Sequence, residues 1–280
     1  MKELFLQTPD HFPIAVKIFE PENSGGKLLL INAATGVKQQ VYFSFAKYFT
    51  EKGFTVMTYD YRGVGESKPE KMRGFEASMR IWGTVDFKTV SGFIKENYRH
   101  YAKFCLGHSV GALILGMNED SVMFEKLIFV ATQDAYIGNL SLKVALTAAV
   151  GFGLALPLTV ILKGYFPAHR FGLGESLPKG TAYDWRTLIL HKRSTSRLFE
   201  KIESDFSKNL NQETLIIHAE DDPWVTMKGM ESLMNNAYPN LKKKYREIKV
   251  SESPQKEIGH INFFRSYNRN LWKIVSDEIQ

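Results

Sequence analysis

The sequence predicts an α/β protein in which a mostly parallel central sheet is covered by helices on both faces. Short apolar runs of strand length alternate with longer runs of helical spacing along most of the chain. The run "KLLLIN" (27–32) is apolar almost throughout, as expected of a strand covered on both faces of a parallel sheet. With 280 residues, 44% hydrophobic and 24% charged, the chain is long enough for one large domain with a buried core.

The first part of the chain predicts a hairpin and then alternating strands and helices. Residues 2–7 and 14–19 alternate in polarity and are joined by Thr8-Pro9-Asp10, which predicts an antiparallel hairpin at one edge of the sheet. The next predicted helix stops at Gly53. Further strands are expected at 27–32, 54–60, 101–106 and 126–131, and helices at 39–52, 84–98 and 110–118.

The alternation stops in the middle of the chain. Residues 133–205 contain many aromatic side chains and no clear strand. Beyond them, strands are expected at 214–219 and 244–250, and helices at 228–236 and 261–278. We therefore expect residues 1–132 and 206–280 to form the core. Residues 133–205 are expected to form an inserted helical cap above the carboxyl edge of the sheet, where such folds bind ligands.

Charge and cysteine content narrow the classes of function. The net charge is +6, but the lysines are scattered, and the one tight basic run (242–246) begins just before a predicted strand, which indicates a solvated edge instead of a nucleic-acid surface. Cys105 is the single cysteine, so an intrachain disulfide and a CxxC metal site are excluded. The first sixteen residues have no long apolar stretch, which predicts a cytoplasmic protein.

The stretch "KFCLGHSVGALI" (103–114) carries the main chemical signal. Gly107-His108-Ser109-Val110-Gly111 is a GxSxG pattern that follows an apolar strand and opens a helix. In that context the turn exposes the serine as a nucleophile, and glycines are needed because side chains there would clash. The alternative is an ordinary glycine-rich turn from a strand to a helix. We expect Ser109 to be the nucleophile.

A serine nucleophile needs a histidine base and an acid that orients it, and this type of fold supplies them in the order Ser, Asp or Glu, His. Of seven histidines, His260 in "EIGHINFF" follows the last predicted strand and opens the last helix, so it is the expected base. His218 lies inside a strand, which favours a core position, and His108 is expected to point away from Ser109. The remaining histidines lie away from the ends of strands and are His11, His100, His169 and His191.

The acid is expected after the next-to-last strand, in "HAEDDPWVT". Asp222 precedes Pro223, which fixes the turn that directs its carboxylate. Asp221 is adjacent and must point elsewhere, which favours a solvated loop residue, and Asp134 after an earlier strand is the remaining alternative. An oxyanion hole needs two backbone N–H donors. We expect them at Val110 and, within one residue either way, at Ala34.

Several motifs together resemble the α/β-hydrolase superfamily over nearly the whole chain. "YDYRGVGES" (59–67) is similar to the superfamily's DxRGxGxS loop. "INAATG", "TAYDW" and "IGHINFF" are similar to a bacterial branch of predicted serine hydrolases akin to monoglyceride lipases and serine aminopeptidases. The resemblance implies the α/β-hydrolase fold. The usual His-Gly after the third strand is Asn32-Ala33 here, and the second glycine of the elbow helix is Ala112.

These observations predict a serine hydrolase that cleaves a carboxylic ester through an acyl-enzyme. A peptidase or thioesterase is the alternative and would need a charged anchor such as Glu175 or Asp184. A non-catalytic ligand-binding protein on the same fold is a third hypothesis, disfavoured because it has no need of all three triad residues. Neither HExxH nor GxxxxGK[ST] occurs, and Gly63-Val64-Gly65 lacks the third glycine of a dinucleotide site, so neither a metal nor a cofactor is expected.

Residues 144–162, "VALTAAVGFGLALPLTVIL", form the longest uncharged stretch and lie between Lys143 and Lys163. Nineteen residues approach the length that spans a bilayer. A crossing here would separate Ser109 from its partners, so we expect a bent pair of cap helices. Their apolar face is expected to cover Ser109 and form the acyl pocket, with a transient membrane contact when the cap opens.

Overall fold

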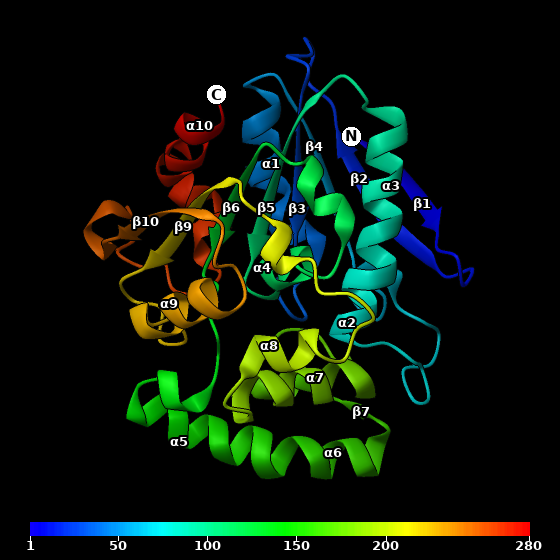
Figure 1. Cartoon of the computed structure of the whole chain (residues 1–280), viewed down its shortest axis with the longest axis vertical. Helices are drawn as coiled ribbons and strands as arrows, with labels where there is room; N and C mark the ends of the chain where they lie inside the picture. Colours follow the sequence, from blue (N-terminus) through cyan, green and yellow to red (C-terminus); the bar gives the residue numbers. More distant parts are fainter.

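The computed structural model describes residues 1–280 and has an eight-stranded sheet at its centre (Figure 1). The strand order is β1-β2-β4-β3-β5-β6-β9-β10. β1 and β2 are antiparallel to their neighbours and all other pairs are parallel. The strands are β1 Lys2–Gln7, β2 Pro13–Phe19, β3 Lys27–Asn32, β4 Phe54–Tyr59, β5 Ala102–His108, β6 Lys126–Val130, β9 Glu213–Ala219 and β10 Lys242–Ile248. The predicted hairpin and mostly parallel sheet are confirmed.

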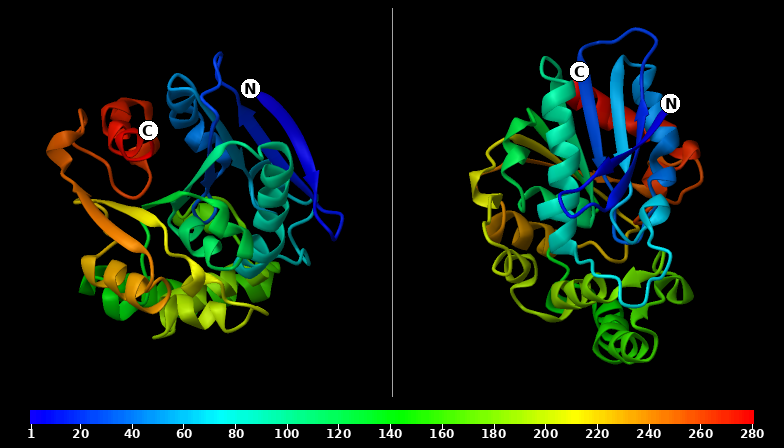
Figure 2. Two further views of the ribbon diagram at one scale, coloured as in Figure 1. Left: turned by 45° about the horizontal axis from the view of Figure 1, so that its top comes forward. Right: turned by 90° about the vertical axis from the view of Figure 1, so that its right-hand side faces the viewer.

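Helices cover both faces of this sheet. α1 (Phe43–Thr50) and α10 (Lys273–Ile279) pack on one face, and α3 (Lys88–Asn97), α4 (Val110–Leu115) and α9 (Met227–Asn236) pack on the other (Figure 2). The strands between them are buried almost throughout, because helices shield both of their faces from water. One core of 71 buried residues results.

Some predicted helices differ from the structure. The expected helix over 261–278 is wrong in its first part: Asn262–Phe264 and Ser266–Trp272 are 3₁₀ turns, and only α10 is α-helical. Asn268 is non-helical and buried, and its side-chain amide donates to the carbonyls of Glu257 and Asn262, which interrupts the helix. The expected helix over 84–98 begins earlier, at α2 (Met79–Ile81), and passes through a π-helical segment, Trp82–Phe87, before α3.

The chain between β6 and β9 lies beyond the carboxyl ends of the strands (Figure 1). Two layers are visible: α7 (Lys179–Leu190) and α8 (Ser194–Phe199) lie next to the sheet, and α5 (Leu142–Val150) and α6 (Leu156–Lys163) lie outermost. A π-helical segment, Gly151–Ala155, joins α5 to α6. A two-stranded ribbon of β7 (Tyr165–Phe166) and β8 (Leu177–Pro178) follows, although no strand was expected there.

Candidate active site

Ser109 occupies the turn between β5 and α4 in a strained backbone conformation, with φ 53° and ψ −117°. The turn is so tight that the positions on either side of Ser109, 107 and 111, have room only for glycine. A Cβ on Gly107 would lie 2.5 Å from the backbone of Ala112, and a Cβ on Gly111 would lie 2.2 Å from the carbonyl oxygen of Asn32. The Ser109 amide donates to the carbonyl of Val130 at 2.9 Å, which ties the turn to the neighbouring strand. Strain held by surrounding structure is typical of functional positions.

The loops after β9 and β10 bring a histidine and an aspartate together. His260 Nδ1 lies 2.7 Å from Asp222 Oδ2. The Asp222 side chain is fully buried, and its other oxygen accepts from the amide of Trp224 at 2.9 Å. A carboxylate fixed in this way orients the ring so that Nδ1 carries a proton and Nε2 is left for chemistry. Ser109 and His260 line one cavity, so the structure brings the three residues predicted for the triad to one site.

The two other candidate acids, Asp221 and Asp134, are engaged in hydrogen bonds away from the His260 ring. Asp221 was expected to be a solvated loop residue, but its oxygens accept from the amides of Ile258 and Gly259, both at 2.9 Å. These amides directly precede His260, so Asp221 holds the loop that carries the histidine. Asp134 is buried and accepts from Ser232 Oγ at 2.8 Å, which makes it part of the packing between the β6 loop and α9.

A chain of hydrogen bonds runs behind the nucleophile. His108 is fully buried, with Nε2 2.8 Å from the carbonyl oxygen of His260 and Nδ1 2.8 Å from Tyr42 Oη. Burial lowers the pKa of His108 well below its ordinary value, and nearby His260 lowers it further, so the ring is neutral. A carbonyl only accepts, so Nε2 carries the proton and the Tyr42 hydroxyl donates to Nδ1. As expected, His108 does not serve Ser109, but sequence reasoning missed this role.

The same tyrosine changes the expected oxyanion hole. The Ala34 amide donates to Tyr42 Oη at 3.0 Å, so the N–H group predicted as the second oxyanion donor is already bonded. No sequence pattern predicts the hydrogen bond between Ala34 and Tyr42, because Tyr42 lies eight residues further along the chain, on the turn that precedes α1. Thr35, the next residue, lies on the cavity wall with Ser109. Val110 is the first residue of α4, where an amide has no partner within the helix.

Comparisons with known proteins show what the sequence and the fold resemble. The model of the serine aminopeptidase family S33 matches residues 28–144, the part of the chain that contains the elbow. A soluble variant of monoglyceride lipase from Saccharomyces cerevisiae superposes with a TM-score of 0.69 at 15% identity, covering 100% of this chain and 96% of that one. The chain therefore has the fold of these α/β hydrolases.

Two further solved structures share the fold at low identity. An esterase from Exiguobacterium antarcticum gives a TM-score of 0.63 at 16% identity, with 99% of each chain covered. An α-β serine hydrolase homologue from Coxiella burnetii gives 0.56 at 14%, with 100% of this chain and 97% of that one covered. No curated protein matches this chain.

The cavity beside Ser109 has a volume of about 400 Å³ and a mostly apolar wall. Trp185, Leu188 and Ile189 of α7 form one side of it, and Trp224 and Val225 form another. The sequence predicted that residues 144–162 would cover Ser109, and this is wrong, since none of them lines the cavity. α7 takes that place because it lies between the sheet and the outer α5–α6 layer (Figure 1).

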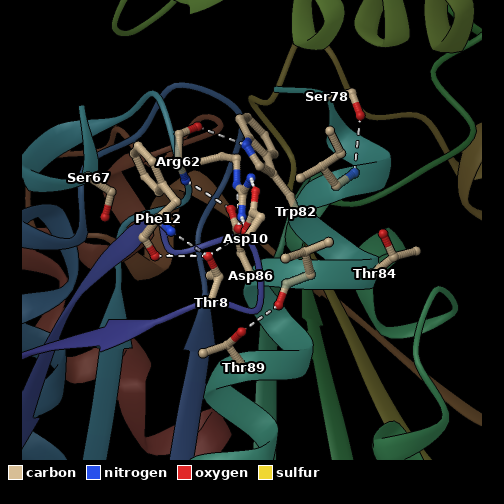
Figure 3. Close-up of polar contacts among 12 residues, drawn as sticks. Thr8, Asp10, Phe12, Arg62, Ser67, Ser78, Trp82, Thr84, Asp86 and Thr89 are labelled. Atoms are coloured by element: carbon tan, nitrogen blue, oxygen red, sulfur yellow. Dashed lines mark hydrogen bonds and ion pairs between the residues drawn. The ribbon is translucent and has the colours of Figure 1, made fainter. Parts of the chain in front are cut away.

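The loop after β4 is braced by buried charges (Figure 3). Arg62 is buried; its Nε lies 2.6 Å from Asp86 Oδ1 and its Nη1 2.6 Å from Asp10 Oδ2. Its carbonyl accepts from Trp82 Nε1 at 3.0 Å. The loop is therefore tied both to the β1–β2 turn and to the π-helical segment before α3.

The two carboxylates weighed as substrate anchors are already paired. Glu175 lies on the cavity wall, but its oxygens accept from the Gly65 amide at 2.8 Å and from Lys68 at 2.7 Å. Asp184 lies outside the cavity and pairs with Arg80 at 3.0 Å. No group of three or more His, Cys, Asp or Glu side chains is placed to hold a metal ion.

Proposed function

We propose that this protein is a serine hydrolase, an esterase that cleaves carboxylic esters with an apolar acyl group. One observation carries the proposal: Ser109 and the Asp222-bound His260 line the same apolar cavity. The paired states of Glu175 and Asp184 favour an ester over a peptide, because neither carboxylate is free to bind a substrate amine. Residues 133–205 act as a cap that supplies the acyl-binding wall through α7.

In this proposal the reaction passes through an acyl-enzyme. His260 Nε2 removes the proton of the Ser109 hydroxyl as Oγ attacks the ester carbonyl. The oxyanion is held by the amides of Val110 and, in place of Ala34, Thr35. The tetrahedral intermediate collapses, the alcohol leaves with the proton from His260, and the acyl group stays on Ser109. Water, deprotonated by His260, then attacks the acyl group. The bond from the acyl carbon to Ser109 Oγ breaks, His260 returns the proton to Oγ, and the acid is released.

The test compares turnover of p-nitrophenyl esters of increasing chain length with an amino-acid p-nitroanilide and an acyl thioester. We expect ester hydrolysis and covalent labelling by a fluorophosphonate probe, both lost in Ser109→Ala, by about 10⁴-fold or more in rate. Ser141→Ala, an exposed serine whose side chain caps no helix, is the matched control and should keep both.

Three results would count against the proposal. Faster cleavage of the anilide than of any ester would support the peptidase alternative, which the serine aminopeptidase model also favours. A preference for the thioester would support a thioesterase. A folded wild-type protein that neither turns over any substrate nor labels would support a non-catalytic binding protein.

A further inference from the structure

The helix running from α5 through Gly151–Ala155 to α6 is apolar on two opposite faces. Its inner face is buried and consists of Ala148, Phe152, Leu156 and Val160. Its outer face is 50–77% exposed and consists of Leu142, Leu146, Val150, Leu154, Leu158, Ile161 and Leu162. These seven are more than half of the thirteen large hydrophobic side chains exposed on the whole chain, so they form a patch and are not a scatter. We call this set the outer stripe.

The π-helical segment keeps the outer stripe on one side of the helix. Residues repeating every four positions drift by about 40° per step around a regular α-helix, or about 200° from Leu142 to Leu162. A π turn takes up one extra residue, which reduces that drift to about 100°, the width of an amphipathic face. Arg186 Nε donates to the carbonyl of Phe152 at 2.9 Å inside this segment. This hydrogen bond from α7 stabilises the π-helical segment.

The segment of the chain that holds the outer stripe carries only positive charge. The sequence has no aspartate or glutamate between Asp134 and Glu175. Lys143, Lys163 and Arg170 lie in this interval, at the two ends of the helix and just beyond it, and none of them forms an ion pair. An apolar stripe with cations at its ends matches the surface of a lipid layer with anionic headgroups.

The topology decides how such a helix meets lipid. Leu142–Lys163 has 22 residues, enough by length to span a membrane, and its side chains are mostly apolar. However, β6 before it and β9 after it are hydrogen-bonded neighbours in one sheet, so both ends of the helix stay on the same side of any membrane. The helix forms the outermost layer of the molecule (Figures 1 and 2). From these observations we infer that the outer stripe docks the protein on an anionic lipid surface, with the helix lying in the plane of the interface.

The test measures flotation with phosphatidylcholine vesicles, with and without phosphatidylglycerol. It uses the Ser109→Ala protein, so that no lipid is consumed. We expect flotation with the anionic vesicles that weakens at high salt. Adding Leu154→Asp should lower the partition coefficient about tenfold or more. Lys143→Ala with Lys163→Ala should weaken binding to anionic vesicles by about fivefold per lysine and leave binding to neutral vesicles unchanged.

Val122→Asp is the matched control, because Val122 is 58% exposed against 59% for Leu154 and lies before β6, away from the outer stripe. Each variant is also made with Ser109 intact, and turnover of p-nitrophenyl acetate should be unchanged, which shows that the fold is kept. The inference is overturned if the parent protein floats with neither kind of vesicle. It is also overturned if Val122→Asp and Leu154→Asp weaken flotation equally. It is also overturned if the parent forms a dimer that Leu154→Asp dissociates while vesicle binding is absent, because the stripe then contacts a second copy.

Discussion

At the scale of single residues, the site depends on which atoms carry protons. Asp222 determines the tautomer of His260 through one 2.7 Å contact. The carbonyl of His260 determines the tautomer of His108, and His108 in turn orients the hydroxyl of Tyr42. One hydrogen-bonded chain therefore links the loop of Ala34, the nucleophile elbow and the base.

Replacing Asp222 by asparagine tests the first of these contacts. Asp222→Asn leaves the volume unchanged but favours the wrong tautomer of His260, so kcat should fall by about 10³- to 10⁴-fold. Asp221→Asn is the matched control: its one side-chain oxygen can still accept from one of the two amides before His260, and Asp221 does not contact the His260 ring, so we expect a much smaller loss of kcat. An equal loss in the two variants, measured with one p-nitrophenyl ester, would contradict the assignment of Asp222.

Tyr42→Phe tests the chain behind the elbow. It removes the hydroxyl that the Ala34 amide and His108 share, and leaves two buried polar groups without a partner. We expect the free energy of unfolding to fall by about 1–3 kcal/mol. If Tyr42 also positions the site, kcat should fall with KM nearly unchanged, and fluorophosphonate labelling should slow. Tyr48→Phe, on α1 with a 3.4 Å contact to Ser276, is the control and should alter neither kinetic value. Lower stability with unchanged kinetics would show that the chain is structural only.

At the scale of elements, two layers of helices beyond the sheet have different roles. α7 places Trp185, Leu188 and Ile189 on the cavity wall, whereas the helix from α5 to α6 places its large side chains between the layers or in solvent. The inner layer is therefore expected to set the acyl preference, and the outer layer is not.

Trp185→Ala should reduce kcat/KM for long-chain p-nitrophenyl esters by about tenfold relative to the acetate ester, because the variant loses apolar contact with the chain. Leu158→Ala removes an exposed apolar side chain from the outer layer and should leave this ratio unchanged. A change in chain-length preference from Leu158→Ala that matches that of Trp185→Ala would place the acyl pocket under the outer helix instead.

At the scale of the whole molecule, the buried Arg62 joins parts that are distant in the sequence. Arg62 bridges Asp10 in the β1–β2 turn and Asp86 in the segment before α3 (Figure 3). The hydrogen bond from Arg62 lowers the pKa of Asp10 well below its ordinary value. A carboxyl group whose pKa is lower in the folded state stabilises the fold above its unfolded pKa and loses this effect as the pH falls.

Asp10→Asn should therefore lower the free energy of unfolding at about pH 6. The difference in this free energy between the variant and the wild type should become smaller as the pH falls through about 4 toward 3. Because the Asp10 side chain is 54% exposed, we expect a difference of less than about 1 kcal/mol even at its largest. Urea unfolding at several pH values measures it. A difference that stays constant over this range would show that the charge of Asp10 contributes nothing.

The sequence by itself determined the sheet, the order of its strands along the chain, and the positions of Ser109, Asp222 and His260 at the ends of strands. These features follow from local rules. Continuous apolar runs indicate buried strands, glycines flank a tight turn, and residues that follow parallel strands meet at one edge of the sheet.

Only the tertiary structure decided which side chains meet across that edge. The bond from Ala34 to Tyr42, the hold of Asp221 on the His260 loop and the pairing of Asp184 with Arg80 depend on loop paths that no local pattern encodes. The face that the apolar helix from α5 to α6 turns toward the protein is the clearest case. Its sequence is apolar on two faces, so composition alone could not say which face packs inward, and the placement of α7 between this helix and the sheet decided it.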